Sequence, residues 1–319
     1  MKVLIADKFE KAGLEQLQAM GCNVTLDADL SGESLRDAVR ENGAQVLIVR
    51  STKVPPDVIE AGKSLELIIR AGAGYDTIDT AAAKQHGIRV CNCPGKNSVA
   101  VAELTLGMML SLDRRIVDNT LDLRNGVWAK KEYSKARGLK GRTLGIVGLG
   151  RIGYEIAKRA AAFDMNLIYS DVIDQKEIEK ELGIRKVPFE HLLAEADFVS
   201  LHVPGGAGTR HMISTDQFKM MKPTAFVLNC SRGGVVDEKA LVEAVENGRI
   251  AGAGLDVYEI EPLATGTVFE DSVIKAARVY GTHHIGASTE QAQLAVADEV
   301  VRIIAEKMKG NDPPNCVNM

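Results

Sequence analysis

The segment from Thr143 to Asp171 constrains the fold of this chain more than any other. Leu144–Val147 form an apolar run of strand type, Gly148–Gly153 follow it with the spacing G-x-G-x-x-G, and an amphipathic helix and a second apolar strand come next. Glycines at these positions permit a tight turn, and the N-terminus of the helix offers free N–H groups and a positive dipole to a pyrophosphate. This order of elements predicts a Rossmann-type dinucleotide-binding unit.

Asp171 indicates which dinucleotide this unit takes. It ends the second strand of the segment, near the acidic position expected about 20 residues after such a glycine turn. A carboxylate there accepts hydrogen bonds from a ribose 2'-hydroxyl and repels a 2'-phosphate, which favours NAD over NADP. Because the glycine turn starts only at Gly148, we expect another domain before it.

The rest of the chain alternates short apolar runs of strand type with longer helical patterns, which is typical of parallel α/β sheets. Outside the glycine segment, strands are expected at 2–6, 46–49 and 65–69. Helices are expected at 14–20, 35–41, 99–112 and 289–310. A polar stretch without strands is expected at 118–141, and a second α/β series runs from 143 to about 287. The pattern predicts two doubly wound parallel-sheet domains.

Composition argues against several classes of protein. The 319 residues are 45% hydrophobic and 26% charged, and 39 basic against 43 acidic side chains give a net charge of -4, which does not favour a nucleic-acid partner. No apolar run has the length of a signal peptide or a membrane span, so we expect a cytoplasmic protein with no membrane partner. The five cysteines form no C-x-x-C pair, which favours reduced thiols and neither a disulfide framework nor a metal site.

Polar side chains follow successive strand candidates of the second α/β series. They are His202 and Pro204, Arg232, Asp256, Glu261, and the adjacent pair His283 and His284. Residues beyond the carboxyl ends of parallel strands line the ligand crevice of such a sheet. An arginine binds a carboxylate or polarises a carbonyl, a histidine exchanges a proton near neutral pH, and a carboxylate orients the imidazole. Each residue alone fits a surface or turn position, but together they predict a reaction centre for a charged oxo-acid.

Seven stretches that span nearly the whole chain carry a family resemblance. They are "VRSTKV" (49–54), "IRAGAGYDTID" (69–79), "NSVAVAELTLGMML" (97–110), "GRTLGIVGLGRIG" (141–153), "LNCSRGGVVDEKAL" (228–241), "AGAGLDVYEIEP" (251–262) and "HIGAST" (284–289). Through them the chain resembles the D-isomer-specific 2-hydroxyacid dehydrogenases, and most of all their phosphoglycerate dehydrogenase branch in a short form without a regulatory domain.

The resemblance implies an arrangement of two domains. A flavodoxin-like substrate domain would comprise residues 1–97 and 288–319, and a Rossmann NAD-binding domain residues 98–287, with the active site in the cleft between them. It also implies a homodimer formed through the NAD-binding domains, with the 118–141 segment at the interface.

Site residues follow from the resemblance position by position. The catalytic arginine, glutamate and histidine fall on Arg232, Glu261 and His284, whereas His283 stands where the family commonly has proline. The implied cofactor contacts are Gly148, Gly150, Arg151, Ile152, Gly153, Asp171, Val203, Pro204, Cys230, Ser231, Asp256, Gly286 and Ala287. The implied substrate contacts are Arg50, Ser51, Arg70, Ala71, Gly72, Ala73 and Gly74.

The resemblance further implies reversible hydride transfer between NAD and a 2-hydroxy acid, with His284 as acid and base. Arg50, Ser51 and Arg70 match positions where the phosphoglycerate branch binds a phosphate, while Ala73 replaces a hydroxyl residue often found there. The expected reaction is therefore oxidation of D-3-phosphoglycerate to 3-phosphohydroxypyruvate or its reverse, the first step of serine biosynthesis. Two alternatives stay open: a glyoxylate, hydroxypyruvate or other D-2-hydroxyacid reductase, and a non-enzymatic NAD(H)-sensing binding protein.

Overall fold

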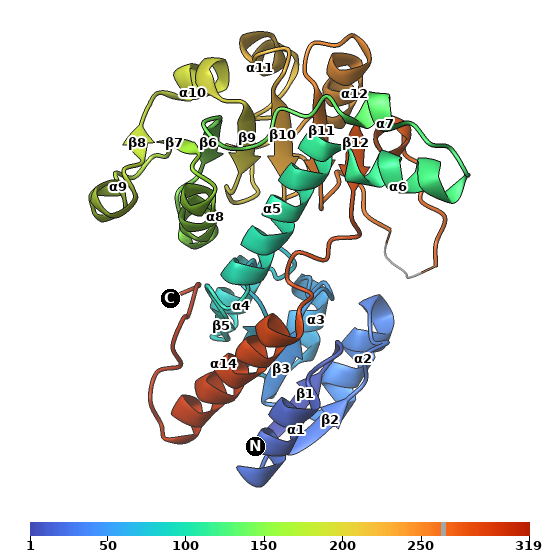
Figure 1. Cartoon of the computed structure of the whole chain (residues 1–319). Helices are drawn as coiled ribbons and strands as arrows, with labels where there is room; N and C mark the ends of the chain where they lie inside the picture. Colours follow the sequence, from blue (N-terminus) through green and yellow to red (C-terminus); the bar gives the residue numbers. More distant parts are fainter. Residues whose placement is uncertain (263–265) are drawn as a thin grey trace. The chain divides into compact units, whose positions relative to one another are not determined.

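The computed structural model describes residues 1–262 and 266–319. These residues form two units, which we describe separately: a terminal unit of residues 1–97 and 287–319, and a central unit of residues 98–286. Each is built on one parallel sheet, so the predicted fold class of two doubly wound α/β domains is confirmed (Figure 1). No helix in the described part of the chain is both long and apolar enough to span a bilayer.

The terminal unit contains a five-stranded parallel sheet. In spatial order its strands are β2 (Asn23–Leu26), β1 (Lys2–Ile5), β3 (Val46–Val49), β4 (Leu67–Arg70) and β5 (Arg89–Asn92). The order 2-1-3-4-5 is that of the flavodoxin-like fold. Strands β2 and β5 were not predicted, because β2 is an exposed edge strand and β5 is a short run with a polar residue at each end.

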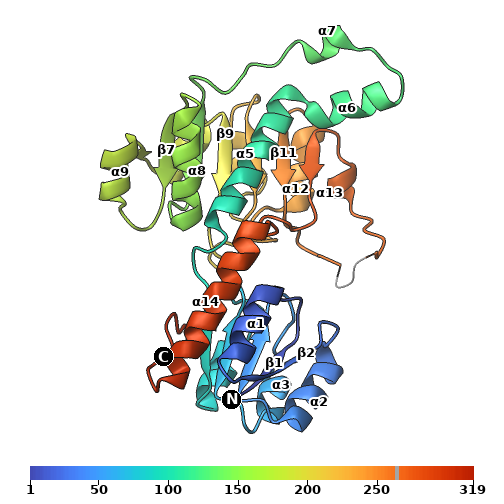
Figure 2. The ribbon, with the colours of Figure 1, turned by 60° about the horizontal axis from the view of Figure 1, so that its bottom comes forward.

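Helices cover both faces of this sheet. The helices of the terminal unit are α1 (Lys11–Ala19), α2 (Gly32–Asn42), α3 (Pro56–Ala61), α4 (Thr80–Gln85) and α14 (Glu290–Met308). Alternate strand residues point to opposite faces, so α1 and α14 pack on the side chains of Val3, Ile5 and Ile48, and α2, α3 and α4 pack on the other set. The two ends of the chain meet in this unit, since α1 and α14 lie side by side in both views (Figures 1 and 2).

The central unit contains a seven-stranded parallel sheet. In spatial order its strands are β12 (Val279–Gly281), β11 (Gly252–Leu255), β10 (Phe226–Asn229), β9 (Phe198–Leu201), β6 (Thr143–Val147), β7 (Asn166–Ser170) and β8 (Arg185–Lys186). Read from β8, this is the Rossmann order 3-2-1-4-5-6 with a seventh strand added. The order reverses between β6 and β9, which is where such sheets bind dinucleotides.

The helices of the central unit are α5 (Ser98–Arg114), α6 (Ile116–Arg124), α7 (Lys130–Tyr133), α8 (Arg151–Ala162), α9 (Lys176–Leu182), α10 (Phe189–Glu195), α11 (Thr215–Met220), α12 (Glu238–Glu246) and α13 (Ser272–Lys275). The helices α5 and α8 cover one face of the sheet, and α10, α11 and α12 cover the other. The 118–141 stretch lacks strands as predicted, and α6 buries none of its residues.

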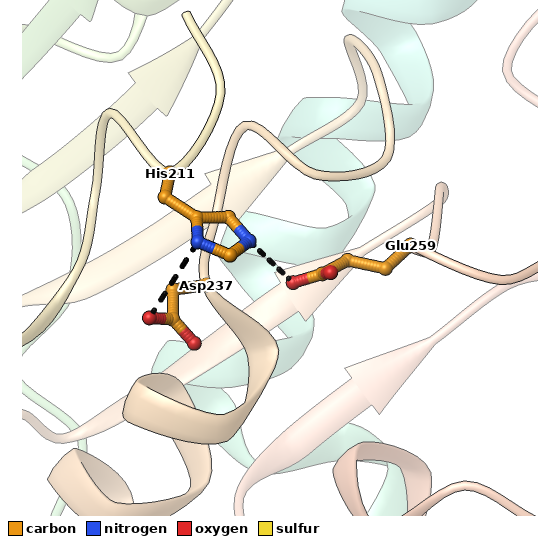
Figure 3. A group of neighbouring side chains, drawn as sticks. All are labelled: His211, Asp237 and Glu259. Atoms are coloured by element: carbon orange, nitrogen blue, oxygen red, sulfur yellow. Dashed lines mark hydrogen bonds and ion pairs between the residues drawn. The ribbon is translucent and has the colours of Figure 1, made fainter.

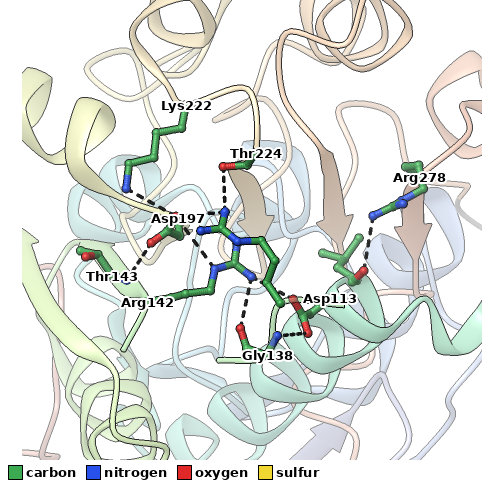
Figure 4. A network of polar contacts seen from close by, with 10 residues as sticks. Asp113, Gly138, Arg142, Thr143, Asp197, Lys222, Thr224 and Arg278 are labelled. Carbon is green, nitrogen blue, oxygen red and sulfur yellow. Dashed lines mark hydrogen bonds and ion pairs between the residues drawn. The ribbon is translucent and has the colours of Figure 1, made fainter. Parts of the chain in front are cut away.

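A buried ionic network fixes the amino-terminal edge of this sheet (Figure 4). Arg142, the residue before β6, is 6% exposed and donates to the Asp113 carboxylate at 2.9 Å. Its guanidinium also lies 4.2 Å from the ring centroid of Phe198, a cation–π contact. Asp197 accepts the backbone N–H of Thr143 at 3.0 Å, so it holds the start of the same strand. The network is at the opposite end of the strands from the glycine turn.

Candidate active site

The glycine turn after β6 has the backbone geometry that a bound pyrophosphate requires. Gly148 has φ of 91°, and a Cβ there would lie 2.6 Å from the carbonyl oxygen of His202. A Cβ on Gly153 would collide with the carbonyl of Gly148, so only glycine lets α8 start this close to the strand. Gly150 is the N-cap and Arg151 and Ile152 begin α8, whose free N–H groups face the turn. The residues present therefore fit a dinucleotide phosphate.

Asp171 lies beside this turn. It follows β7, and one carboxylate oxygen accepts the N–H of Leu149 at 2.7 Å while the other accepts the N–H of Ile173 at 3.0 Å. These two bonds hold the carboxylate at the point where β6 and β7 end, the position of a ribose partner in such sheets.

The loops after β9 and β10 are fixed by polar side chains, of which His202 is half-buried and Asn229 is buried. The imidazole of His202 shares a 2.7 Å hydrogen bond with the Ser200 hydroxyl, and burial lowers the pKa of His202 to about 3, so this imidazole is neutral. The next residues are Val203, half-buried, and Pro204, exposed. Sequence reasoning missed Ser200. The one signal that could have indicated it is a hydroxyl side chain inside the apolar strand β9.

Asn229 organises the loop that carries the predicted arginine. Its side chain accepts the N–H and the hydroxyl of Ser231, at 3.1 and 2.7 Å, and donates to the carbonyl of Arg232 at 2.9 Å. Cys230 is buried, and burial raises the pKa of its thiol to about 12, which makes it a packing residue rather than a nucleophile. Asn229 was also missed by sequence reasoning, although an asparagine at the end of an apolar strand is a signal for such a turn.

Asp256, which follows β11, holds the loop of residues 282–286 in place by hydrogen bonds. One of its oxygens accepts the N–H of Ile285 at 2.8 Å and the Thr282 hydroxyl at 2.6 Å, and the other accepts the N–H of Gly286 at 2.7 Å. Asp256 is 1% exposed, so these bonds replace the water it lost on burial. Asp256 thereby sets the position of His284, which lies between two of the residues it binds.

Glu261 and His284 form a hydrogen-bonded pair. His284 Nδ1 lies 2.8 Å from Glu261 Oε2, and the imidazole side chain is 52% exposed. Burial raises the pKa of Glu261, but the hydrogen bond and charge of His284, the N–H of Tyr258 and the charge of Arg232 outweigh it and hold the pKa below its ordinary value. The carboxylate therefore stays ionised and orients the imidazole, leaving Nε2 for a proton transfer.

The backbone at His284 has an uncommon conformation. Its φ of 52° lies in the left-handed region, which non-glycine residues enter rarely and which concentrates at functional sites. The bonds from Asp256 to the two following N–H groups maintain it. The neighbouring His283 is exposed, and only His284 of the two has a carboxylate partner among the described contacts.

A second histidine, His211, contacts the loop that carries Glu261 (Figure 3). His211 Nε2 lies 3.0 Å from Glu259 Oε1, and its Nδ1 lies 3.8 Å from Asp237 Oδ2. Within residues 1–262 and 266–319 these three side chains are the group whose atoms lie close enough for a metal ion. The carboxylates contact opposite ring nitrogens, however, so the imidazole bridges them and holds Glu259, two residues before Glu261.

In the terminal unit, Arg50 and Ser51 follow β3 at the carboxyl edge of the sheet. The carboxylate of Asp7, which follows β1, accepts the backbone N–H groups of Arg50, Ser51 and Thr52 at 2.6, 3.1 and 3.1 Å, and the Ser51 hydroxyl at 2.9 Å. The donors of Ser51 therefore already have an acceptor, which sequence reasoning did not foresee. The guanidinium of Arg50 extends instead to the Ser288 hydroxyl at 3.5 Å.

Arg70 ends β4, and the loop of residues 71–74 follows it. The guanidinium of Arg70 lies over Gly72, where any Cβ would collide with it, and Gly72 has φ of 151°. The carbonyls of Gly72 and Ala73 accept the N–H of Cys93 at 2.8 Å and the side chain of Asn92 at 2.6 Å. The structure thus brings Arg50 and Arg70 to adjacent strand ends, since β3 and β4 are neighbours.

Comparison with known proteins identifies the family. Residues 106–286 match the model of the D-isomer specific 2-hydroxyacid dehydrogenase NAD binding domain. The chain belongs to this family. The match confirms NAD as the predicted cofactor and covers the glycine turn, Asp171, Arg232, Glu261 and His284.

Individual relatives differ in what they act on. The chain is 42% identical to a D-3-phosphoglycerate dehydrogenase of Methanocaldococcus jannaschii over 100% of its own length and 60% of that protein, so it spans about three fifths of that relative. It is 45% identical to a hydroxypyruvate reductase of Thermotoga maritima over 264 residues, 82% of this chain and 84% of that protein. The structure of a glyoxylate reductase from Paecilomyes thermophila matches with a TM-score of 0.88 and 29% identity, covering 99% of this chain and 98% of that one.

Replacing Asp171 is expected to change the preference between NAD and NADP. Loss of a hydrogen bond to a charged group costs about 1.5–3 kcal/mol, or roughly 10- to 100-fold in the ratio of kcat/KM for the two cofactors. The matched pair is Asp171→Ala and Asp171→Asn, because asparagine keeps an acceptor for the Leu149 N–H and removes only the charge. Both should favour NADP relative to the parent, and an unchanged ratio in both would contradict the assignment of Asp171 to the ribose.

Proposed function

We propose that this chain catalyses the NAD-dependent oxidation of D-3-phosphoglycerate to 3-phosphohydroxypyruvate, or the reverse reduction, the first step of serine biosynthesis. The observation that carries the chemical part is the Glu261–His284 pair, 2.8 Å apart, on the sheet edge that also holds the glycine turn. A histidine oriented by an ionised carboxylate beside a nucleotide-binding turn is suited to moving the proton of a substrate hydroxyl.

The proposed mechanism divides the work among three side chains. The bound nicotinamide supplies the hydride acceptor, or the donor in the reverse direction. His284 Nε2 takes the hydroxyl proton of the 2-hydroxy acid during oxidation and returns it to the carbonyl oxygen during reduction. Glu261 stabilises the imidazolium that forms, and Arg232, whose charge already lowers the pKa of Glu261, binds the substrate carboxylate and carbonyl oxygen.

The phosphate part of the proposal rests on Arg50. Its guanidinium lines a hollow of the terminal unit together with Lys8, Ser288 and Thr289. Thr289 is the N-cap of α14, a helix of 19 residues, whose first N–H groups and positive dipole end favour an anion. Two cations, a hydroxyl and a helix N-terminus make a suitable environment for a substrate phosphate, although Glu10 and Glu290 line the same hollow.

A reductase of glyoxylate or hydroxypyruvate is the second candidate. It is favoured by the Asp7 contacts, because a carboxylate holds the donors of Ser51 that a phosphate would otherwise use. A non-enzymatic role in sensing NAD(H) requires the same cofactor site but no turnover.

We propose further that the chain forms a homodimer through the central unit, with the segment of residues 118–141 and the adjoining start of α6 at the interface. The exposed apolar side chains of α6 and the turn after it are Ile116, Val117, Leu121, Leu123, Val127 and Trp128, the last 80% exposed. An exposed apolar surface of this kind is typical of a protein–protein contact. If two copies pack these segments against each other, the apolar side chains of both copies are removed from water. Molar mass from light scattering tests this part of the proposal.

The test of the proposed function is NADH oxidation with 3-phosphohydroxypyruvate, hydroxypyruvate, glyoxylate and pyruvate in parallel. A kcat/KM for the phosphorylated acid at least about tenfold above the others supports the phosphoglycerate reaction. A preference for the unphosphorylated acids supports the reductase, and NADH binding without turnover of any acid supports the sensing role.

Arg50→Gln is expected to lower kcat/KM for a phosphorylated substrate without affecting the hydride and proton transfer steps. The variant removes the guanidinium but keeps the backbone N–H that Asp7 accepts, so the loop retains its anchor. We expect kcat/KM for 3-phosphohydroxypyruvate to fall roughly 10- to 100-fold, the worth of one hydrogen bond to a charged group, with glyoxylate nearly unaffected. Equal losses for both acids would remove Arg50 from phosphate binding.

A further inference from the structure

The C-terminal segment of residues 311–319 covers the edge of the sheet in the terminal unit. The edge strand is β5, and the segment is bound to it by the hydrogen bonds Asn92 N–H to Asn315 O at 3.3 Å and Val317 N–H to Val90 O at 2.8 Å. The Asn318 side chain adds two more bonds, accepting the N–H of Val90 and donating to the carbonyl of Ile88, both at 2.8 Å. The C-terminal segment therefore forms hydrogen bonds with backbone N–H and C=O groups that an uncovered edge strand would expose.

Cys91 and Cys316 lie directly opposite each other in this contact. They form an antiparallel bridge, and the two backbone bonds join the residues on either side of them rather than the cysteines themselves. This is the non-hydrogen-bonded type of pair, in which the Cα atoms are about 4.5 Å apart and the side chains are closest. Disulfides form at Cα separations of roughly 4.4–6.8 Å, so the separation typical of such a pair lies within the range that a disulfide spans.

The surroundings distinguish the two thiols. Cys91 is fully buried, and burial, followed by its interactions with the Cys316 thiol, raises the pKa of Cys91 to about 12. Cys316 is partly exposed, with its thiol 3.4 Å from the Asn318 side-chain oxygen. An oxidant in solution therefore reaches Cys316 first, and Cys91 is the group placed to react with the product.

We propose that Cys91 and Cys316 are a modification site, at which a peroxide forms a reversible disulfide that fastens the C-terminal segment to β5. In the first step the Cys316 thiolate attacks a peroxide oxygen, the O–O bond breaks, and a sulfenic acid and hydroxide form. In the second the Cys91 sulfur attacks the Cys316 sulfur, the S–O bond breaks, and the released hydroxide takes the Cys91 proton. Two thiols lose two electrons, and hydrogen peroxide becomes two waters.

The other cysteines provide internal controls. Cys93, two residues from Cys91, directs its thiol to the carbonyl of Val296 in α14 at 3.9 Å. Cys22 contacts the sulfur of Met308 at 3.9 Å, and Cys230 lies in the central unit beside Met108. None of these three faces another cysteine across a backbone bridge in the described residues.

The test is treatment of the full chain with hydrogen peroxide, alkylation under denaturing conditions, and mass spectrometry of tryptic peptides. We expect free thiols to fall from five to three, and the peptide of residues 90–96 to be joined to that of residues 310–319, with dithiothreitol separating them. The midpoint of thermal unfolding should rise by several degrees on oxidation, because the new bond closes a very long loop.

Variants decide which cysteines react. Cys93→Ser should keep the joined peptides, whereas Cys91→Ala and Cys316→Ser should each abolish them and the rise in unfolding midpoint. Cys316 is partly exposed, so its serine variant keeps the test valid if the buried Cys91→Ala does not fold. A link that persists without Cys91, a link between two chains, or oxidation of Cys316 to the sulfinic acid without any link would each overturn the proposal.

Discussion

His284→Ala is expected to lower kcat by about 10²- to 10⁴-fold, the usual contribution of one general acid or base, while NADH binding is retained. The imidazole is the proton carrier of the proposed mechanism and contacts Glu261, whereas the glycine turn and Asp171 follow other strands, β6 and β7. Stopped-flow measurement of kcat, with NADH affinity from fluorescence titration, separates the two effects.

Two further variants make this prediction specific. Since His284 has φ of 52°, His284→Asn is the matched variant, because asparagine tolerates the left-handed conformation better than alanine does. It should lose turnover as alanine does. His283→Ala should keep both turnover and NADH binding, because only His284 of the two contacts a carboxylate among the described residues. Equal losses in the His283 and His284 variants would refute the choice of His284.

Asp113→Ala is expected to destabilise the central unit by roughly 3–5 kcal/mol. Arg142 is 6% exposed and the Asp113 side chain 4% exposed, so the variant leaves a buried guanidinium without its closest carboxylate. Removing one partner of a buried ion pair has this cost because the remaining charge keeps its desolvation penalty. The measurement is the urea midpoint of unfolding, followed by circular dichroism.

The controls use an exposed pair and a double variant. Lys140 lies 2.9 Å from Asp164 with side chains 84% and 65% exposed, so Lys140→Ala should leave the urea midpoint nearly unchanged. The double variant Asp113→Ala with Arg142→Met should recover much of the lost stability, because an apolar pair leaves no uncompensated charge. If Asp113→Ala alone unfolds at the urea midpoint of the parent, the pair is not the anchor of this sheet edge.

The fold was largely predictable because its main signals are local. The glycine spacing at 148–153 and the apolar runs at 46–49 and 144–147 correspond to elements with the expected type and nearly the expected ends. Strand β5 was missed because its register depends on β4 on one side and on Cys316 and its neighbours on the other, over 200 residues later. Such pairing leaves no periodic pattern in the strand itself.

The sequence indicated which residue types lie at the site, but it did not indicate which hydrogen-bond partner each side chain has. Asp256 and Asp7 both follow strands, where ligand-binding carboxylates are expected, yet both use their oxygens on nearby backbone N–H groups. Whether a carboxylate turns toward a ligand or a loop depends on which donors lack a partner, and this is a property of the folded chain. The residues alone indicated Glu261 and the two adjacent histidines, and only the family resemblance selected His284 rather than His283.

The division of the terminal unit between both ends of the chain affects how the protein is made. A ribosome adds about 5–20 residues per second, so α14 emerges on the order of tens of seconds after the first 97 residues. Until then the sheet face that α14 covers, with Val46, Leu67 and Ile69, is shielded only in part. The central unit is continuous in sequence and can complete its sheet during this interval. Nascent chains stalled before α14 are therefore the ones on which chaperones should act.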